Sequence, residues 1–98
     1  MARKLKPVHP GEILREDFMK PMGISINLLA REIYVPPGRI SEIVNGKRGI
    51  TADTALRLGR YFSVSPELWM GLQTEYDLRV ATQTVGKDIE KRVHPHAA

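Results

Sequence analysis

A short helix with a clear start and a clear end, in residues 35–51, limits the fold more than any other feature of this sequence. The stretch reads VPPGRISEIVNGKRGIT. Prolines are tolerated in a first helical turn, because the amide groups there have no partner within the helix. At the other end, Asn45 and Gly46 are a normal left-handed terminator. The pattern therefore predicts a helix of barely two turns, starting near Pro37. Its predicted buried residues are Ile40, Ile43 and Val44.

The first turn of this predicted helix is sterically open. It contains Pro37 and Gly38, and neither residue has a long side chain. Gly38 removes bulk at a place where another surface could come close. The open turn is therefore a candidate contact surface for another molecule.

Four more segments show helical periodicity, so we expect an all-α chain of five helices. The first runs from Pro10 to about Met19, and the sequence KPMG at residues 20–23 is expected to break it. The last is expected to end near Val80 or a few residues later. Three helices begin after residues that favour the N-cap position, which are Ser25, Thr51 and Ser65.

The length of 98 residues and a hydrophobic content of 42% suit one compact domain. We expect this domain to cover residues 1–84, with a basic arm at residues 1–8. Residues 85–98 are polar, charged and broken by proline, so we expect a flexible tail there.

The charge balance favours an acidic partner. The formal net charge is +4, which makes nucleic acid the first candidate and anionic lipid the second. The chain has no cysteine, which excludes disulfides and thiolate chemistry. No apolar run approaches the roughly 20 residues that cross a bilayer, and no signal-peptide core is present, so we expect a cytoplasmic protein.

The sequence contains no convincing catalytic or metal-binding pattern. His94 and His96 lie in the expected tail, with neither a cysteine nor a spaced carboxylate to complete a metal site. Glu12 and Glu16 share a helix face, but a solvated surface explains them better. A phosphate-loop motif is also absent, because Ser41 stands where its first glycine is required. We therefore expect no enzyme activity, no metal and no cofactor.

The second and third predicted helices resemble a helix-turn-helix of the lambda-repressor type, within the xenobiotic-response-element family of five-helix domains. Ala30 is small enough for a close helix crossing, and Ile40 and Ile43 face inward. Tyr34 departs from the pattern, because glycine usually occupies this turn position. A left-handed tyrosine costs about 1 kcal/mol, so we expect a strained or reshaped turn.

The outward face of the third helix carries the residue types that read DNA. Arg39 can donate paired hydrogen bonds to guanine, and Glu42 can accept one from a cytosine amine. A surface ion pair between these two residues is the alternative interpretation. The ends of the motif would hold phosphates, which fix the register on DNA without reading sequence. The expected DNA-binding residues are Ser25, Asn27, Pro37, Gly38, Arg39, Ser41, Glu42, Asn45, Lys47 and Arg48.

Four blocks in order extend the resemblance over residues 7 to about 81. They are HPGEILRE, ISEIVNGKR, ITADTALRLGRYF and SPELWMGLQTEYDL. Together they resemble the HigA-type, or VapI-like, addiction-module antitoxins. The resemblance implies a dimeric DNA-binding protein that represses its own operon and neutralises HigB, a RelE-like ribonuclease toxin. The alternative is an orphan transcription regulator of the same fold without a toxin.

A dimer of this type would bind a palindromic operator of double-stranded DNA, with its two reading helices about 34 Å apart. The expected dimer residues lie off the core stripe of the last helix and are Met70, Gln73, Asp77 and Val80. The alternative is that the core stripe simply widens there.

Acidic side chains are the natural counterparts of a basic toxin. The expected toxin-binding acids on the first helix are Glu12, Glu16 and Asp17. A second set on the last helix comprises Glu67, Glu75 and Asp77. The alternative for both sets is that these acids are ordinary solvated residues on the surface of a helix.

Overall fold

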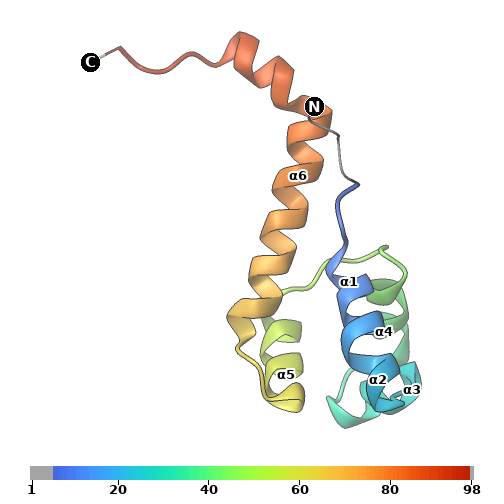
Figure 1. Ribbon diagram of the computed structural model, residues 1–98. Coiled ribbons are helices and arrows are strands. Elements are labelled where there is room, and N and C mark those ends of the chain that lie inside the picture. Colours follow the sequence, from blue (N-terminus) through green and yellow to red (C-terminus); the bar gives the residue numbers. More distant parts are fainter. Residues whose placement is uncertain (1–5, 98) are drawn as a thin grey trace.

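The computed structural model describes residues 6–97, and within that range the chain is helical without strands (Figure 1). The first helix consists of three consecutive pieces, which are α1 (Pro10–Ile13), the π-helical turn η1 (Leu14–Met19) and α2 (Lys20–Met22). The other helices are α3 (Ile26–Glu32), α4 (Pro37–Val44), α5 (Ala52–Phe62) and α6 (Pro66–Arg92). With α1, η1 and α2 counted as one helix, the five predicted helices are confirmed.

The first helix ends later than predicted. It does not break at Lys20 but continues to Met22 and stops at Gly23, which has a φ of 66°. In the π turn the amide of Lys20 donates to the carbonyl of Arg15, five residues back. Pro21 has no amide hydrogen, and its ring clashes with the carbonyl four residues back in a regular α-helix. The wider π turn accommodates this proline inside the helix.

Left-handed residues terminate four of the helices. Two of these residues are glycines, Gly23 and Gly46. The other two are Tyr34, with a φ of 61°, and Ser63, with a φ of 57°. Of the two outcomes expected for this turn, a strained or a reshaped one, the structure shows the strained one, with Tyr34 left-handed. The turn keeps its shape, because the amide of Val35 donates to the carbonyl of Ala30 at 3.0 Å and closes the end of α3.

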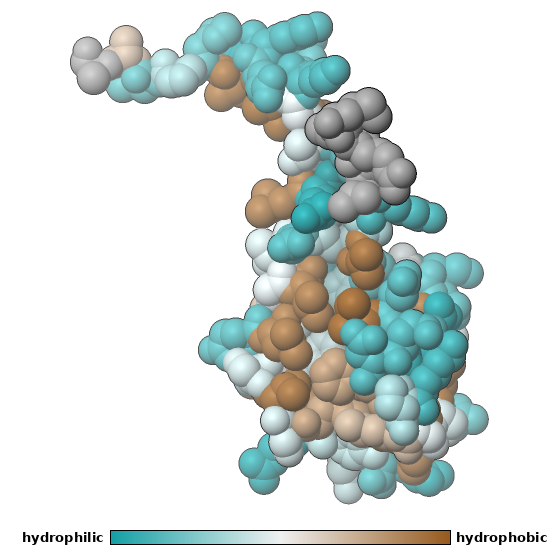
Figure 2. All heavy atoms as spheres, viewed as in Figure 1, coloured by the Kyte–Doolittle hydropathy of each residue, from teal (hydrophilic) through white to brown (hydrophobic). Residues whose placement is uncertain are grey.

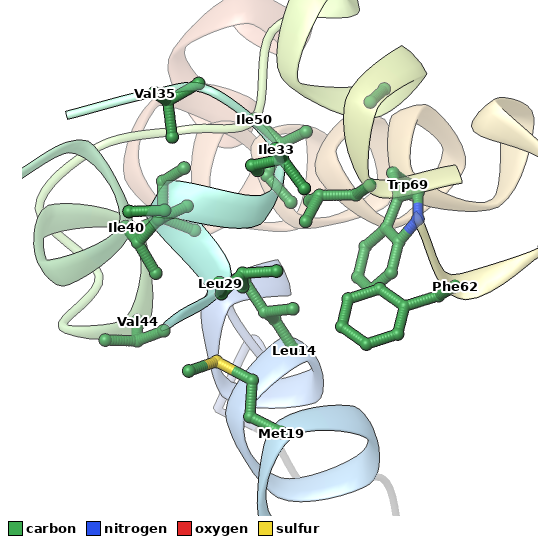
Figure 3. Close-up of a cluster of buried hydrophobic side chains, with 14 residues drawn as sticks. Leu14, Met19, Leu29, Ile33, Val35, Ile40, Val44, Ile50, Phe62 and Trp69 are labelled. Carbon is green, nitrogen blue, oxygen red and sulfur yellow. The ribbon is translucent and has the colours of Figure 1, made fainter. Parts of the chain in front are cut away.

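The core lies where the five helices meet and includes side chains from each of them (Figure 3). Among the fully buried side chains, Leu14 comes from the first helix, Leu29 from α3 and Ile40 from α4. From the other side, Leu58 of α5 and Trp69 of α6 complete the cluster. This core fixes α4 between α1 and α3 and holds its outer face toward solvent. The predicted buried residues of α4 are confirmed, and they are Ile40, Ile43 and Val44.

The last helix is longer than predicted, because α6 reaches Arg92 instead of ending a few residues after Val80. No proline interrupts it before Pro95, and Asp88 and Arg92 form an i, i+4 ion pair at 3.0 Å near its end. Its outer part projects beyond the packed body (Figure 1). The domain boundary at residue 84 and the flexibility of the tail remain predictions. Residues 1–5 of the predicted arm lie outside the described residues, and residues 6–8 have no helix or strand.

Candidate nucleic-acid interface

The N-terminal ends of α3 and α4 form a shallow hollow on the surface. Its volume is about 490 Å³. The residues that line it are Ser25, Ile26, Asn27, Pro37, Gly38 and Ser41. Five of these six are expected DNA-binding residues, so the fold brings half of the predicted site to one place.

The N-terminus of α4 is as bare as the sequence predicted. Its N-cap is Pro36, which makes no side-chain hydrogen bond to the helix, and Pro37 occupies the first helical position. A β-carbon placed on Gly38 would meet no atom within 4 Å, apart from its own helix and chain neighbours. Ser25, in contrast, caps α3 by accepting a hydrogen bond from the amide of Leu28 at 3.1 Å. The hollow thus lies between the N-terminus of α4, which has no side-chain cap, and the N-terminus of α3, which Ser25 caps.

Arg39 emerges on the other side of α4 and faces α5. Its Nη1 atom lies 3.6 Å from Oδ1 of Asp53, a distance that makes an ion pair but not a hydrogen bond. Glu42 pairs with Arg48 instead, at 2.7 Å between Oε1 and Nε. The alternative interpretation, an ion pair between Arg39 and Glu42, is therefore wrong for the described residues 6–97.

The C-terminal end of α4 carries the remaining predicted contacts. The side-chain amide of Asn45 donates to the carbonyl of Ser41 at 2.8 Å, which ties Asn45 to its own helix. Lys47 is exposed and has no ion pair within the described range. Its ammonium group is therefore available to an anion.

Two functional candidates escaped the sequence analysis, and both are on α5. Asp53 accepts a hydrogen bond from Nε of Arg57 at 2.7 Å, and this bond, reinforced by the charges of Arg57 and Arg39, lowers the pKa of Asp53. Arg57 also donates from Nη1 to the carbonyl of Ile33 at 2.8 Å and to that of Tyr34 at 3.3 Å. The i, i+4 spacing could have suggested the Asp53–Arg57 pair. No local signal could have suggested the contact with the end of α3.

A second hollow of about 280 Å³ lies beside these arginines, between the turn of the motif and α5. Arg39, Arg48 and Arg57 all line it, together with Tyr34. Residues of α4 therefore line both hollows, Pro37, Gly38 and Ser41 in the first and Arg39 in the second.

The described residues contain no group of three or more His, Asp or Glu side chains that could hold a metal ion. None of the helices in that part of the chain combines the length with the apolar character needed to cross a bilayer.

The comparison with protein families returns a helix-turn-helix model that matches residues 16–69. Virulence-associated protein I of Dichelobacter nodosus is 55% identical over 80 residues, which are 82% of this chain and 74% of that protein. Antitoxin HigA-1 of Vibrio cholerae is 36% identical over 75 residues, which are 76% of this chain and 70% of that protein. The chain belongs to the HigA/VapI-like family of helix-turn-helix proteins. Membership in this family confirms the resemblance that was inferred from the four sequence blocks.

A solved HigA/VapI-like structure has the same fold throughout. The Pseudomonas aeruginosa antitoxin HigA, solved with the higBA promoter, is 47% identical and matches with a TM-score of 0.90 over 93% of this chain and 99% of that one. The family is not enzymatic, so the prediction of no enzyme activity is confirmed by membership.

Proposed function

We propose that this chain binds an operator in its own promoter through α4, represses its own operon, and neutralises a HigB-like ribonuclease toxin. The observation that carries the DNA part is the open N-terminus of α4 beside a hollow lined by five expected DNA-binding residues. A major groove admits one helix, and an N-terminal turn without bulky side chains can approach the base edges closely. The solved relative that was determined with promoter DNA supports the DNA-binding part of this proposal.

Within this proposal the outer residues of α4 have distinct roles. Arg39 donates to guanine and Glu42 accepts from a cytosine amine, which gives sequence discrimination. Lys47 and Arg48 neutralise phosphates and contribute affinity without discrimination. Glu42 must leave Arg48 to reach a base, which costs little because both side chains are about half exposed, at 48% and 49%.

The operator is palindromic in this proposal, because the chain acts as a homodimer. Exposed apolar side chains recur on one face of α6, with Leu78 63% exposed and Val85 and Ile89 at 45% and 48%. Figure 2 shows apolar side chains gathered along this helix and near its outer end. A second copy of α6 would remove that surface from water.

The expected dimer residues differ in how free they are for a partner chain. Met70 packs partly against the core, as the widened-stripe alternative requires. Gln73 accepts from the amide of Ile50 at 2.8 Å and donates to Asp77 at 2.9 Å, so both polar residues have partners within the chain. The proposal therefore places the apolar part of the interface further along α6 than Met70, on the face that carries Leu78, Val85 and Ile89.

The DNA and dimer parts are tested with the full-length protein and the duplex that precedes its own gene. Nuclease footprinting should protect two half-sites about one helical turn apart, related by a two-fold axis. Sedimentation at micromolar concentration should give a dimer. A monomer would overturn the dimer, and equal binding to the promoter and to a random duplex of the same length would overturn the operator.

The toxin part of the proposal places the contact on the first helix. Glu12 and Asp17 are exposed there and have no ion pair among the described residues, whereas Glu16 pairs with Arg15 at 3.1 Å and with Lys20 at 3.0 Å. The acids of α6 are engaged within that helix, because Glu75 pairs with Arg79 at 3.3 Å and Asp77 accepts from Gln73. Unpaired carboxylates are the better counterpart for a basic surface, since no ion pair has to break.

Co-expression with the product of the adjacent gene tests this part. If that product stops growth alone, the wild-type chain should restore it. Reversing the charges of Glu12, Glu16 and Asp17 should abolish the rescue and leave promoter binding intact. Rescue that survives these reversals but fails when α6 is altered would place the toxin on α6. A harmless neighbour would favour the orphan regulator.

A further inference from the structure

A continuous line of polar contacts connects the end of α3 to the outer face of α4 by way of α5. It begins at the carbonyl of Ile33, which accepts from Nη1 of Arg57 at 2.8 Å. Arg57 then donates from Nε to Oδ1 of Asp53 at 2.7 Å. The same Oδ1 atom lies 3.6 Å from Nη1 of Arg39. One carboxylate oxygen thus joins an anchored arginine to the arginine on the face of α4.

The two arginines on this oxygen differ in how firmly they are held. Arg57 has three acceptors, because its Nη1 atom also lies 3.3 Å from the carbonyl of Tyr34. The guanidinium of Arg39 has one ion pair within residues 6–97, and that ion pair is with Asp53. Its side chain is nevertheless only 32% exposed. The ion pair with Asp53 and the surrounding surface therefore restrict the orientations of the Arg39 guanidinium.

We propose that Asp53 is a positioning residue, which orients Arg39 for base readout through the ion pair that Arg57 holds in place. The inference rests on the proposed operator binding. A guanidinium has five donors in a planar fork, so a carboxylate at Nη1 leaves the Nε and Nη2 edge for the two acceptors of guanine. A preoriented side chain loses less conformational freedom on binding than a free one.

The negative charge of Asp53 allows a positioning role to be distinguished from a general structural role. Asp53 is a negative group close to the surface that meets DNA, and by itself it repels phosphates. Replacing it with asparagine should raise affinity for random DNA slightly and lower discrimination at the base that Arg39 reads. A simple loss of folding would lower both.

Asp53→Asn is the test variant, and Asp88→Asn is its matched control. Asp88 also pairs with an arginine at i+4, at 3.0 Å, and its side chain is 62% exposed against 60% for Asp53. It lies near the outer end of α6, far along the chain from α4. Both variants remove one negative charge and one i, i+4 pair, but only Asp53 contacts Arg39.

The experiment measures dissociation constants by fluorescence anisotropy for the promoter duplex and for a random duplex of equal length. We expect Asp53→Asn to reduce the ratio of the two constants by about 2- to 12-fold, and Asp88→Asn to leave it unchanged. In an Arg39→Ala background, Asp53→Asn should no longer change the ratio. Thermal unfolding of each variant monitors the fold.

An unchanged ratio in Asp53→Asn would overturn the inference and leave the proposed function standing. An equal reduction in the Arg39→Ala background would also overturn it, because the effect would then not pass through Arg39. If the wild-type chain itself shows no preference for its promoter, operator binding fails, and this inference fails with it.

Discussion

Gly11 of α1 lies so close to Ile43 of α4 that a β-carbon on residue 11 would sit 1.7 Å from the Ile43 carbonyl oxygen. This contact sets the distance between the first helix and the helix that carries the DNA-binding face. Gly11 is itself buried, and the atoms that its β-carbon would meet are backbone atoms of Ile43 and Val44, which cannot rotate away as a side chain can.

Gly11→Ala should therefore destabilise the protein severely. The methyl group cannot be accommodated without separating α1 from α4, and overpacking of a core costs at least about 1–3 kcal/mol. Urea unfolding followed by circular dichroism measures the loss. A variant as stable as the wild type would mean that α1 and α4 do not approach this closely.

Tyr34→Gly should stabilise the protein by about 1 kcal/mol, because glycine adopts the left-handed conformation without strain. Tyr34 is 86% exposed, so little packing is lost with its side chain. Tyr34→Ala is the control, since alanine removes the ring but keeps the backbone strain. Denaturant midpoints should rise for glycine alone. A rise of equal size for alanine would assign the effect to the ring.

His9 should make stability fall in mildly acidic solution. Its Nδ1 atom caps α1 by accepting from the amide of Gly11 at 2.9 Å, and its ring packs edge-on against Tyr76. Burial lowers the pKa of His9 below the ordinary value of 6.5, against a smaller opposite effect of Asp77. The folded state therefore binds fewer protons than the unfolded state between the lowered pKa and 6.5. Its contribution is complete above pH 6.5 and is lost as the pH falls through that window.

The pH effect is measured by urea unfolding at several values from about pH 8 to about pH 5, where histidine titrates. His9→Asn is the matched variant, because asparagine is a good N-cap and does not titrate. Its stability should depend less on pH than that of the wild type. Parallel curves for the two proteins would remove His9 as the cause.

The local parts of this fold could be predicted from sequence, because caps and apolar spacing act within a few residues. Ser25, Thr51 and Ser65 were predicted as N-caps, and each accepts a hydrogen bond from an amide in the first turn of its helix. The π turn before Pro21 could not be predicted, because the usual rule is that proline ends a helix. The extra turns of α6 were missed because their composition resembles that of a solvated tail.

The candidate site divides in the same way. The spacing of residues along α4 was enough to predict which of them face outward. The structure places three of these, Pro37, Gly38 and Ser41, around one hollow. Asp53 belongs to a different helix, and its link to Arg39 depends on how α5 packs against the motif. Sequence patterns report neighbours along a helix, and this contact joins residues that only the tertiary fold brings together.

Gly38→Ala should separate stability from DNA binding. Alanine favours a helix over glycine by about 1 kcal/mol, and nothing near Gly38 would clash with its methyl group. The variant should therefore be at least as stable as the wild type and yet bind the promoter more weakly, because the methyl group enters the space that a base edge would occupy. Unfolding and anisotropy titrations on one preparation give both values. Unaltered promoter affinity would place the DNA elsewhere.

The most direct test of the central claim, that α4 reads bases while its C-terminal end holds phosphates, compares Arg39→Ala with Lys47→Ala over a range of salt concentrations. Arg39→Ala should cost about 1–3 kcal/mol of promoter affinity and relax the preference at one base position. Lys47→Ala should weaken binding to every duplex and reduce the slope of log affinity against log salt by about one. Equal losses on promoter and random DNA for both variants would put Arg39 on a phosphate and contradict base readout by α4.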